Sequence, residues 1–202
     1  MCVICAKPQG AKFPSLETFK AMWARNPHGA GFMYARDGKV FIRKGFMTLD
    51  DLLEAIEDSE LKESESVVFH FRISTQAGIT PTMTHPFPVS RNYRDMEALE
   101  ATARIGFAHN GVIARTSCNS KRFSDTALFV TRYVSELLRK PDDVENFALL
   151  DAIEALAPNN RFAIMNGEGK IAFVGDFSKK NGCFYSNLYH EKSPEKWLEG
   201  RF

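Results

Sequence analysis

The second residue of the chain, Cys2, could supply both a nucleophile and a base. A small residue after the initiator Met1 permits removal of that methionine, which would leave the cysteine at the N-terminus. Its α-amine would then have a pKa of about 7.7–8.0 and its thiol a pKa of about 8.5, so the amine can accept the thiol proton near neutral pH. Such a residue needs no separate histidine for nucleophilic attack. The alternative is that Cys2 is an ordinary small second residue.

Cys2 and Cys5 also form a Cys-x-x-Cys pair, a spacing found in zinc and redox sites. A structural zinc ion normally needs four ligands, and no second closely spaced Cys/His pair accompanies this one. We therefore expect Cys5 to be a core thiol and the chain to bind no metal. Four cysteines are too few for a disulfide scaffold in a chain of this size, which favours a reduced, cytoplasmic protein.

Arg72 stands at the end of an apolar stretch, where a guanidinium group would be costly to bury without a partner. Its planar fork suits bidentate capture of a carboxylate, and the following Ser, Thr, Gly and Pro residues are typical of a loop that covers a small ligand. The alternative is an exposed arginine that enters an ordinary turn. His70 and His85, on either side, are expected to be structural polar residues rather than metal ligands.

Two further clusters have both a structural and a chemical interpretation. Asn110-Gly111 follows an apolar stretch and could be a simple turn, or its side-chain amide and the next backbone N–H could form a two-donor oxyanion hole. In Ser124-Asp125, either residue could cap a helix, or the carboxylate could hold an ammonium group of a ligand.

The elements that would position these residues do not follow the strict βαβ order of a parallel sheet. Strands come in hairpin pairs, with turns at Asp37-Gly38 and Asn166-Gly167, and two helices follow one another between strand groups. This pattern predicts an α+β protein in which two antiparallel sheets pack face to face and are covered by helices. The expected strands are Val3–Ala6, Gly31–Tyr34, Val40–Phe46, Val67–Ile73, Ile105–Ala108, Arg161–Asn166, Lys170–Val174 and Cys183–Tyr185, and the expected helices Leu16–Arg25, Thr48–Asp58, Ser124–Arg139 and Val144–Leu156.

The composition is that of a globular protein with one domain over residues 1–202. Hydrophobic residues make up 44% of the chain, which is enough for a sizeable core. Twenty-six basic and 25 acidic residues give a net charge of +1, which argues against a nucleic-acid or anionic membrane partner. No apolar run approaches the roughly 18 residues of a membrane helix, and the N-terminus does not have the pattern of a secretory signal.

In their order and residue types, the clusters resemble the class II glutamine amidotransferases, the glutaminase branch of the N-terminal-nucleophile hydrolases. The resemblance spans residues 1 to about 130, and it implies a four-layer αββα sandwich of two antiparallel sheets. No cofactor and no metal is implied. The matching pieces are Met1-Cys2, Asn26-Pro-His-Gly29-Ala-Gly31-Phe, His70-Phe-Arg72-x-x-Thr75, Thr84-His85-Pro86-Phe87, His109-Asn110-Gly111 and Ser124-Asp125-Thr126.

The resemblance implies a catalytic role for three residues. Cys2 would attack the side-chain amide carbon of glutamine, with its own α-amine as the base and then the proton donor. Asn110 and Gly111 would stabilise the oxyanion. Ammonia would leave, and water would hydrolyse the γ-glutamyl thioester to glutamate.

The resemblance also implies how the substrate is bound. Arg72 would pair with the α-carboxylate of glutamine and Asp125 with its α-ammonium group, so that the site would select a free amino acid. Thr75 and the loop after it would close over the substrate. Gly29 and Gly31 would let the backbone pass close to the nucleophile.

The sequence departs from the family pattern in three places. Gln76-Ala77 stands where better-known members often carry His-Gly, and the charged segment Arg91–Glu100 belongs to an insert that reaches residue 103 and could bind a partner or be an inert loop. The sequence up to Phe202 has none of the synthase domains that use the ammonia in family members, so we expect either a lone glutaminase or one that supplies ammonia to a separate ligase or synthase. Two other functions stay open: hydrolysis of another γ-glutamyl or acyl amide, and an inactive module that binds glutamine or a protein.

Overall fold

The strands of the computed structural model form two antiparallel sheets. The structure describes residues 1–74, 78–116 and 122–191. In the larger sheet the strand order is β10-β11-β1-β4-β2-β3-β6, so that the first strand of the chain lies in the interior of the sheet. These strands are β10 (Ser178–Lys180), β11 (Cys183–Tyr185), β1 (Val3–Lys7), β4 (Val67–Phe71), β2 (Ala30–Arg36), β3 (Lys39–Phe46) and β6 (Glu100–Ala103).

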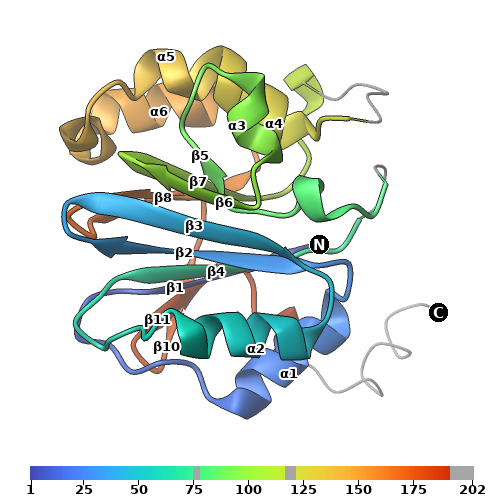
Figure 1. The fold of residues 1–202 in the computed structure, drawn as a ribbon. Helices are drawn as coiled ribbons and strands as arrows, with labels where there is room; N and C mark the ends of the chain where they lie inside the picture. The colour runs from blue at the N-terminus through green and yellow to red at the C-terminus, as the bar shows by residue number, and fades with distance from the viewer. Residues whose placement is uncertain (75–77, 117–121, 192–202) are drawn as a thin grey trace.

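The smaller sheet packs against the larger one, and helices cover the two outer faces (Figure 1). Its strand order is β5-β7-β8-β9. Helices α1 and α2 cover the seven-stranded sheet, whereas α3 to α6 lie on the side of the four-stranded sheet. The strands are β5 (Phe87–Pro88), β7 (Ile105–Asn110), β8 (Arg161–Asn166) and β9 (Ile171–Val174), and the helices α1 (Leu16–Arg25), α2 (Leu49–Asp58), α3 (Tyr93–Glu97), α4 (Asp125–Phe129), α5 (Ser135–Leu137) and α6 (Phe147–Leu156).

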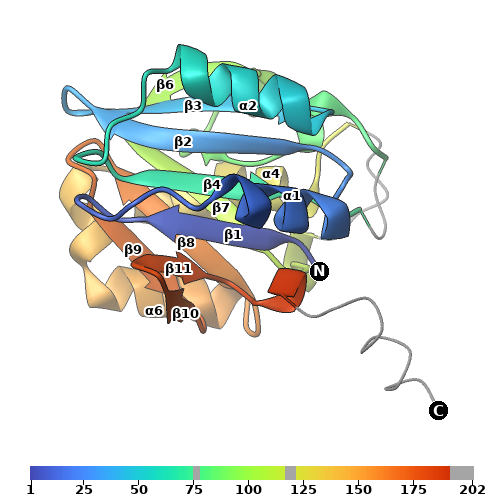
Figure 2. The same ribbon diagram turned by 90° about the horizontal axis from the view of Figure 1, so that it is seen from below.

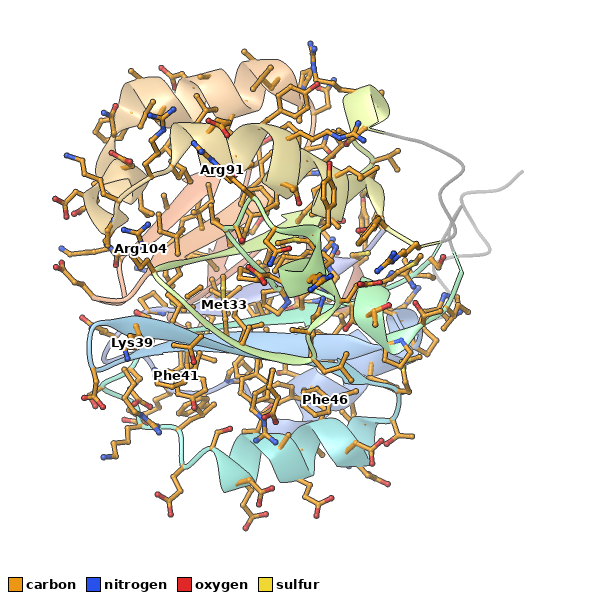
Figure 3. All side chains as sticks on the ribbon, turned by 45° about the horizontal axis from the view of Figure 1, so that its top comes forward. Met33, Lys39, Phe41, Phe46, Arg91 and Arg104 are labelled. Atoms are coloured by element: carbon orange, nitrogen blue, oxygen red, sulfur yellow. The ribbon has the colours of Figure 1, made fainter. Side chains whose placement is uncertain are left out.

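This arrangement confirms the predicted α+β class with two antiparallel sheets. Strand side chains alternate between two cores, as Figure 3 shows for Met33, which points to the space between the sheets, and Phe41, which points towards α2. Phe46 also packs on the α2 side because the register of β2 and β3 shifts beside it. Gly45, with a φ of +92°, is the extra residue of this bulge.

The helices begin and end close to the predicted residues because their capping residues are visible in the sequence. Ser15 caps α1 and Thr48 caps α2 through their hydroxyl oxygens. The predicted helix Ser124–Arg139 is α4 and α5 joined by a π-helical turn over Val130–Val134. The helix predicted from Val144 instead begins at Phe147, because Asn146 caps it. Among the described residues, no helix is both long and apolar enough to cross a membrane.

The insert at residues 91–103 is part of the architecture. It forms α3, capped by Asn92, and β6, which pairs with β3 and forms one edge of the larger sheet. Strands β5, β6 and β10 were not predicted. The second hairpin has the predicted strands, but its loop spans residues 167–170, and the left-handed residue in it is Gly169 rather than Gly167.

A buried lysine ties this insert to the sheet. Lys44 lies on β3 and is only 3% exposed. Its Nζ donates to the carbonyl oxygens of Thr82 (2.9 Å) and Met96 (2.7 Å). The ammonium also lies 3.8 Å from the centre of the Phe87 ring. Burial lowers the pKa of the Lys44 amine to about 7, against the attraction of Glu97, so the interior disfavours its charged form.

We predict that stability depends on pH through Lys44. Between the folded pKa of about 7 and the unfolded pKa of about 10.4, the unfolded chain holds a proton on Lys44 that the folded chain has lost. The free energy of unfolding should therefore rise with pH in this window, by up to ~1.4 kcal/mol per pH unit relative to Lys44→Met. Urea unfolding of both proteins from pH 6 to 10 measures the difference. If the free energies of unfolding of the wild type and Lys44→Met change with pH in parallel, the prediction is wrong.

Candidate functional site

The ends of four strands and the start of one helix meet at one end of the sandwich. In the antiparallel register of β1 and β4, Val3 pairs with Phe71, which places Cys2 and Arg72 beside each other just beyond the pair. Figure 2 shows the start of the chain at this end of β1, close to the turn that follows β11. Strand β7 ends here at Asn110, and α4 begins nearby at Asp125.

Cys2 is held by backbone groups. Its Sγ lies 3.4 Å from the donating N–H of Ile73 and 3.6 Å from the Ile73 carbonyl oxygen. Its own carbonyl oxygen accepts from the side-chain amide of Asn187 at 2.7 Å. Burial raises the pKa of the thiol, although the Ile73 backbone and Arg72 oppose this shift. At neutral pH the thiol is therefore protonated, and attack by its sulfur requires a base.

Arg72 is a buried cation with unused hydrogen-bonding capacity. The residue is 6% exposed, and Nη2 donates to the carbonyl oxygen of Gly78 at 3.2 Å. No described residue accepts a hydrogen bond from its buried Nη1. Burial lowers the pKa of the guanidinium, while Cys2 and Asp125 raise it, so both groups lie within electrostatic reach. Such a group favours an anionic ligand, which would accept from the unpartnered nitrogen.

Asn110 and Gly111 form a constrained turn after β7. Asn110 is 1% exposed, its Nδ2 donates to Ser186 Oγ at 2.9 Å, and no described residue donates to its buried Oδ1. Gly111 has a φ of +151°, and a Cβ at this position would overlap Asn160 Oδ1. The turn therefore holds the side-chain amide of Asn110 and the backbone of Gly111 in a fixed conformation.

Asn160 is itself immobilised, which makes the turn rigid. Its Nδ2 lies within hydrogen-bonding distance of the carbonyl oxygens of Val112, Ala157 and Pro158, at 3.0–3.3 Å. Its Oδ1 accepts from His109 Nε2 at 2.7 Å. This assigns the proton of His109 to Nε2, and the Thr126 hydroxyl then donates to Nδ1 at 2.7 Å.

Ser124 is the helix cap, and the carboxylate of Asp125 remains available to hold an ammonium group. Ser124 Oγ accepts from the N–H of Ala127 and is the helix cap. The Asp125 carboxylate accepts from the backbone N–H of Ile113 (2.8 Å) and of Thr126 (2.7 Å). These bonds orient the half-buried carboxylate and leave it with further lone pairs for a cation.

Three buried histidines support the site from behind. The carbonyl oxygen of His109 accepts from His70 Nε2 (2.9 Å) and His85 Nδ1 (3.1 Å). Burial and the neighbouring His109 lower the pKa of His70 to about 3, and burial lowers the pKa of His85 and of His109 as well. All three are neutral near pH 7, as expected of structural polar residues. In the described part of the chain, no three His, Cys, Asp or Glu side chains are grouped to hold a metal ion.

The structure brings six of the eight predicted site residues to this end of the sandwich: Cys2, Gly29, Arg72, Asn110, Gly111 and Asp125. Gly29 lies beside Arg72, because its carbonyl oxygen accepts from the Arg72 backbone N–H at 2.8 Å. Thr75 lies outside the described residues.

The proposed reason for Gly29 and Gly31 needs correction. A Cβ at Gly31 would overlap the carbonyl oxygen of His85, and one at Gly29 would lie 2.7 Å from Thr84 Cγ2. The two glycines make room for the Thr84-His85 segment rather than for the nucleophile, because β4 separates β2 from β1.

Sequence reasoning missed Asn160, Ser186 and Asn187, which contact the site. In the sequence, Asn160 and Ser186 are at least 50 positions from Asn110, and Asn187 is 185 positions from Cys2. Ser186 and Asn187 could have been found, because they form a polar pair directly after the apolar strand Cys183–Tyr185. Asn160 has no comparable signal.

Comparison with models of protein families gives no match to this sequence, and comparison with curated proteins gives none either.

We predict that Gly111→Ala disrupts the turn after β7. The new methyl group would collide with the immobilised Asn160 and would hold a side chain at a left-handed φ. The expected cost is about 1–3 kcal/mol in the free energy of unfolding. Gly78→Ala is the matched control, because a Cβ there meets no atom within 4 Å. Equal unfolding free energies for the two variants would contradict the prediction.

Proposed function

We propose that this chain hydrolyses the side-chain amide of free glutamine to glutamate and ammonia, with Cys2 as the nucleophile. The observation that carries the proposal is the convergence of a thiol, a buried guanidinium with an unpartnered nitrogen, and the Asn110-Gly111 turn at one end of the sandwich. Removal of Met1, which is exposed, would free the α-amine of Cys2. Two packed antiparallel sheets with helices outside are compatible with the four-layer N-terminal-nucleophile hydrolase fold that this reaction would use.

The α-amine of Cys2 would take the proton from its own thiol, either directly or through a water molecule. Since burial raises the pKa of the thiol, this base is essential to the attack. Sulfur would bond to the amide carbon, and the resulting oxyanion would accept from the free N–H of Asn110 Nδ2 and from the backbone N–H of Gly111. Loss of one such donor costs roughly 2.7–4 kcal/mol in a known enzyme. The amine would then protonate the leaving nitrogen, and water would hydrolyse the thioester.

Substrate selection would depend on two charges. The unpartnered Nη1 of Arg72 suits the α-carboxylate of glutamine, and the oriented carboxylate of Asp125 suits its α-ammonium group. A glutamine inside a peptide chain has neither charge, and one at either end has only one of them, so the site would select the free amino acid. Ammonia would pass to a separate ligase or synthase. We place the reaction in the cytoplasm, in keeping with the free thiols of Cys2, Cys5 and Cys183.

Replacement of Cys2 tests the proposed reaction. Wild-type protein whose intact mass shows loss of Met1 should release glutamate and ammonia from glutamine, and Cys2→Ala should release neither, because no sulfur remains to form the thioester. Cys183→Ala, which removes a buried thiol on β11, serves as the control and should retain activity. Glutamate release by verified Cys2→Ala protein would contradict the mechanism. Retention of Met1 together with glutamine binding would instead indicate an inactive binding module.

Arg72 and Asp125 predict a requirement for both free α-groups. Arg72→Met should raise KM for glutamine by about tenfold to a hundredfold, since hydrogen bonds to a charged group contribute about 1.5–3 kcal/mol. Glutamine with an acetylated α-amine or an amidated α-carboxylate should be hydrolysed at least about tenfold more slowly, by the same energies. Steady-state kinetics with the three substrates measures this. Equal rates would favour a broader γ-glutamyl or acyl amide hydrolase.

A further inference from the structure

Ser186 extends the pairing of β11 with β1 beyond the last residue of the strand. Its backbone N–H donates to the carbonyl oxygen of Ile4 at 3.0 Å, as in an antiparallel ladder. The return bond comes from the side chain, because Ser186 Oγ accepts from the N–H of Ile4 at 2.9 Å. The serine is 3% exposed, so this hydroxyl oxygen replaces a backbone carbonyl in the interior.

The same oxygen reaches the other sheet. Ser186 Oγ also accepts from Asn110 Nδ2 at 2.9 Å. Ile4 lies on β1 in the seven-stranded sheet, whereas Asn110 ends β7 in the four-stranded sheet. A single buried atom thus joins the strand that begins beside Cys2 to the side-chain amide across the sandwich. It occupies one N–H of that amide and so sets the direction of the second.

Asn187 fixes Cys2 from the next position. Its Nδ2 donates to the Cys2 carbonyl oxygen at 2.7 Å, and its Oδ1 accepts from the N–H of Tyr189 at 3.2 Å. Since one end of the amide must donate and the other must accept, its orientation is determined. Ser186 and Asn187 therefore contact the residues on either side of the reacting centre.

We propose that Ser186 and Asn187 are positioning residues that set the separation between the Cys2 sulfur and the oxyanion-binding amide of Asn110. This inference rests on the proposed glutaminase function. Neither residue touches Arg72 or Asp125 in the described hydrogen bonds, so both act on the chemical step rather than on capture of the amino acid.

The test separates these two effects. Ser186→Ala removes the acceptor that Ile4 and Asn110 share, so kcat should fall about tenfold to a hundredfold. This decrease is no larger than the decrease in kcat on removal of a direct oxyanion donor. KM for glutamine should change less than about threefold. Ser186→Thr keeps the oxygen and should recover most of the activity. Ser178→Ala, on the exposed strand β10, is the control and should match the wild type. Asn187→Ala should lower kcat in the same way.

A reactive aldehyde gives a second readout. The open-chain form of the γ-semialdehyde of glutamate, which is in equilibrium with a cyclic imine, has both α-groups, and its carbonyl carbon can bond to the Cys2 sulfur while the thiol proton passes to the oxygen. That oxygen occupies the oxyanion position, so Ser186→Ala should weaken binding of the aldehyde by the same factor as kcat and leave binding of glutamate unchanged. The same equilibrium between open-chain and cyclic forms applies to every variant, so the ratio of their apparent affinities is unaffected.

The outcomes are distinguishable. Suppose that the wild type is active and that Ser186→Ala and Asn187→Ala have the same kcat and the same affinity for the aldehyde as the wild type. This result would overturn the inference and leave the proposed function standing. A wild-type protein without Met1 that neither hydrolyses glutamine nor binds the aldehyde would overturn both. If Ser186→Ala fails to fold, as judged by circular dichroism, Asn187→Ala and Ser186→Thr provide the comparison. Equal losses in kcat and in glutamate affinity would indicate a merely structural role.

Discussion

Strand β1 lies between β4 and β11, and the site depends on this antiparallel pairing. All five residues of β1 are buried, with Val3 and Cys5 facing the α1 and α2 side and Ile4 and Ala6 facing the other sheet. An N-terminal segment usually frays, but a strand bonded on both edges cannot move without breaking two ladders. The pairing thus holds Cys2 beside Arg72 through backbone hydrogen bonds alone.

The interior near the start of this strand is polar yet largely uncharged. His70, His85 and His109 are neutral because burial disfavours their imidazolium forms, and each uses a ring nitrogen to satisfy a buried acceptor. Arg72, by contrast, is a cation, and its Nη1 has no hydrogen-bond partner among the described residues. In a low-dielectric setting, an anion bound to it would meet little competition from water. The neutral histidines would therefore strengthen the charge selectivity that we propose for the site.

The central elements were predictable because local patterns determine them. Asp37-Gly38 identified the hairpin of β2 and β3, Asn26-Pro27 identified the end of α1, and Thr48 identified the start of α2. The edge strand β6 was missed because it is short and half exposed, so its pairing with β3 depends on the insert rather than on its own residues. Similarly, the residues that hold the site, Ser186 and Asn187, are defined only by contacts with Ile4 and Cys2 at the opposite end of the sequence.

The adjacency of β1 and β11 has a consequence for the order of events during synthesis. Ile4 and Ser186 are separated by 182 positions, so a ribosome must translate all of the intervening residues before the second edge of β1 can be covered. Until then, β4 can pair with β1 on one side while the other side exposes unpaired N–H and C=O groups. A nascent or prematurely terminated chain would carry its thiol on an open strand edge, and such chains are the ones that chaperones must shield from aggregation.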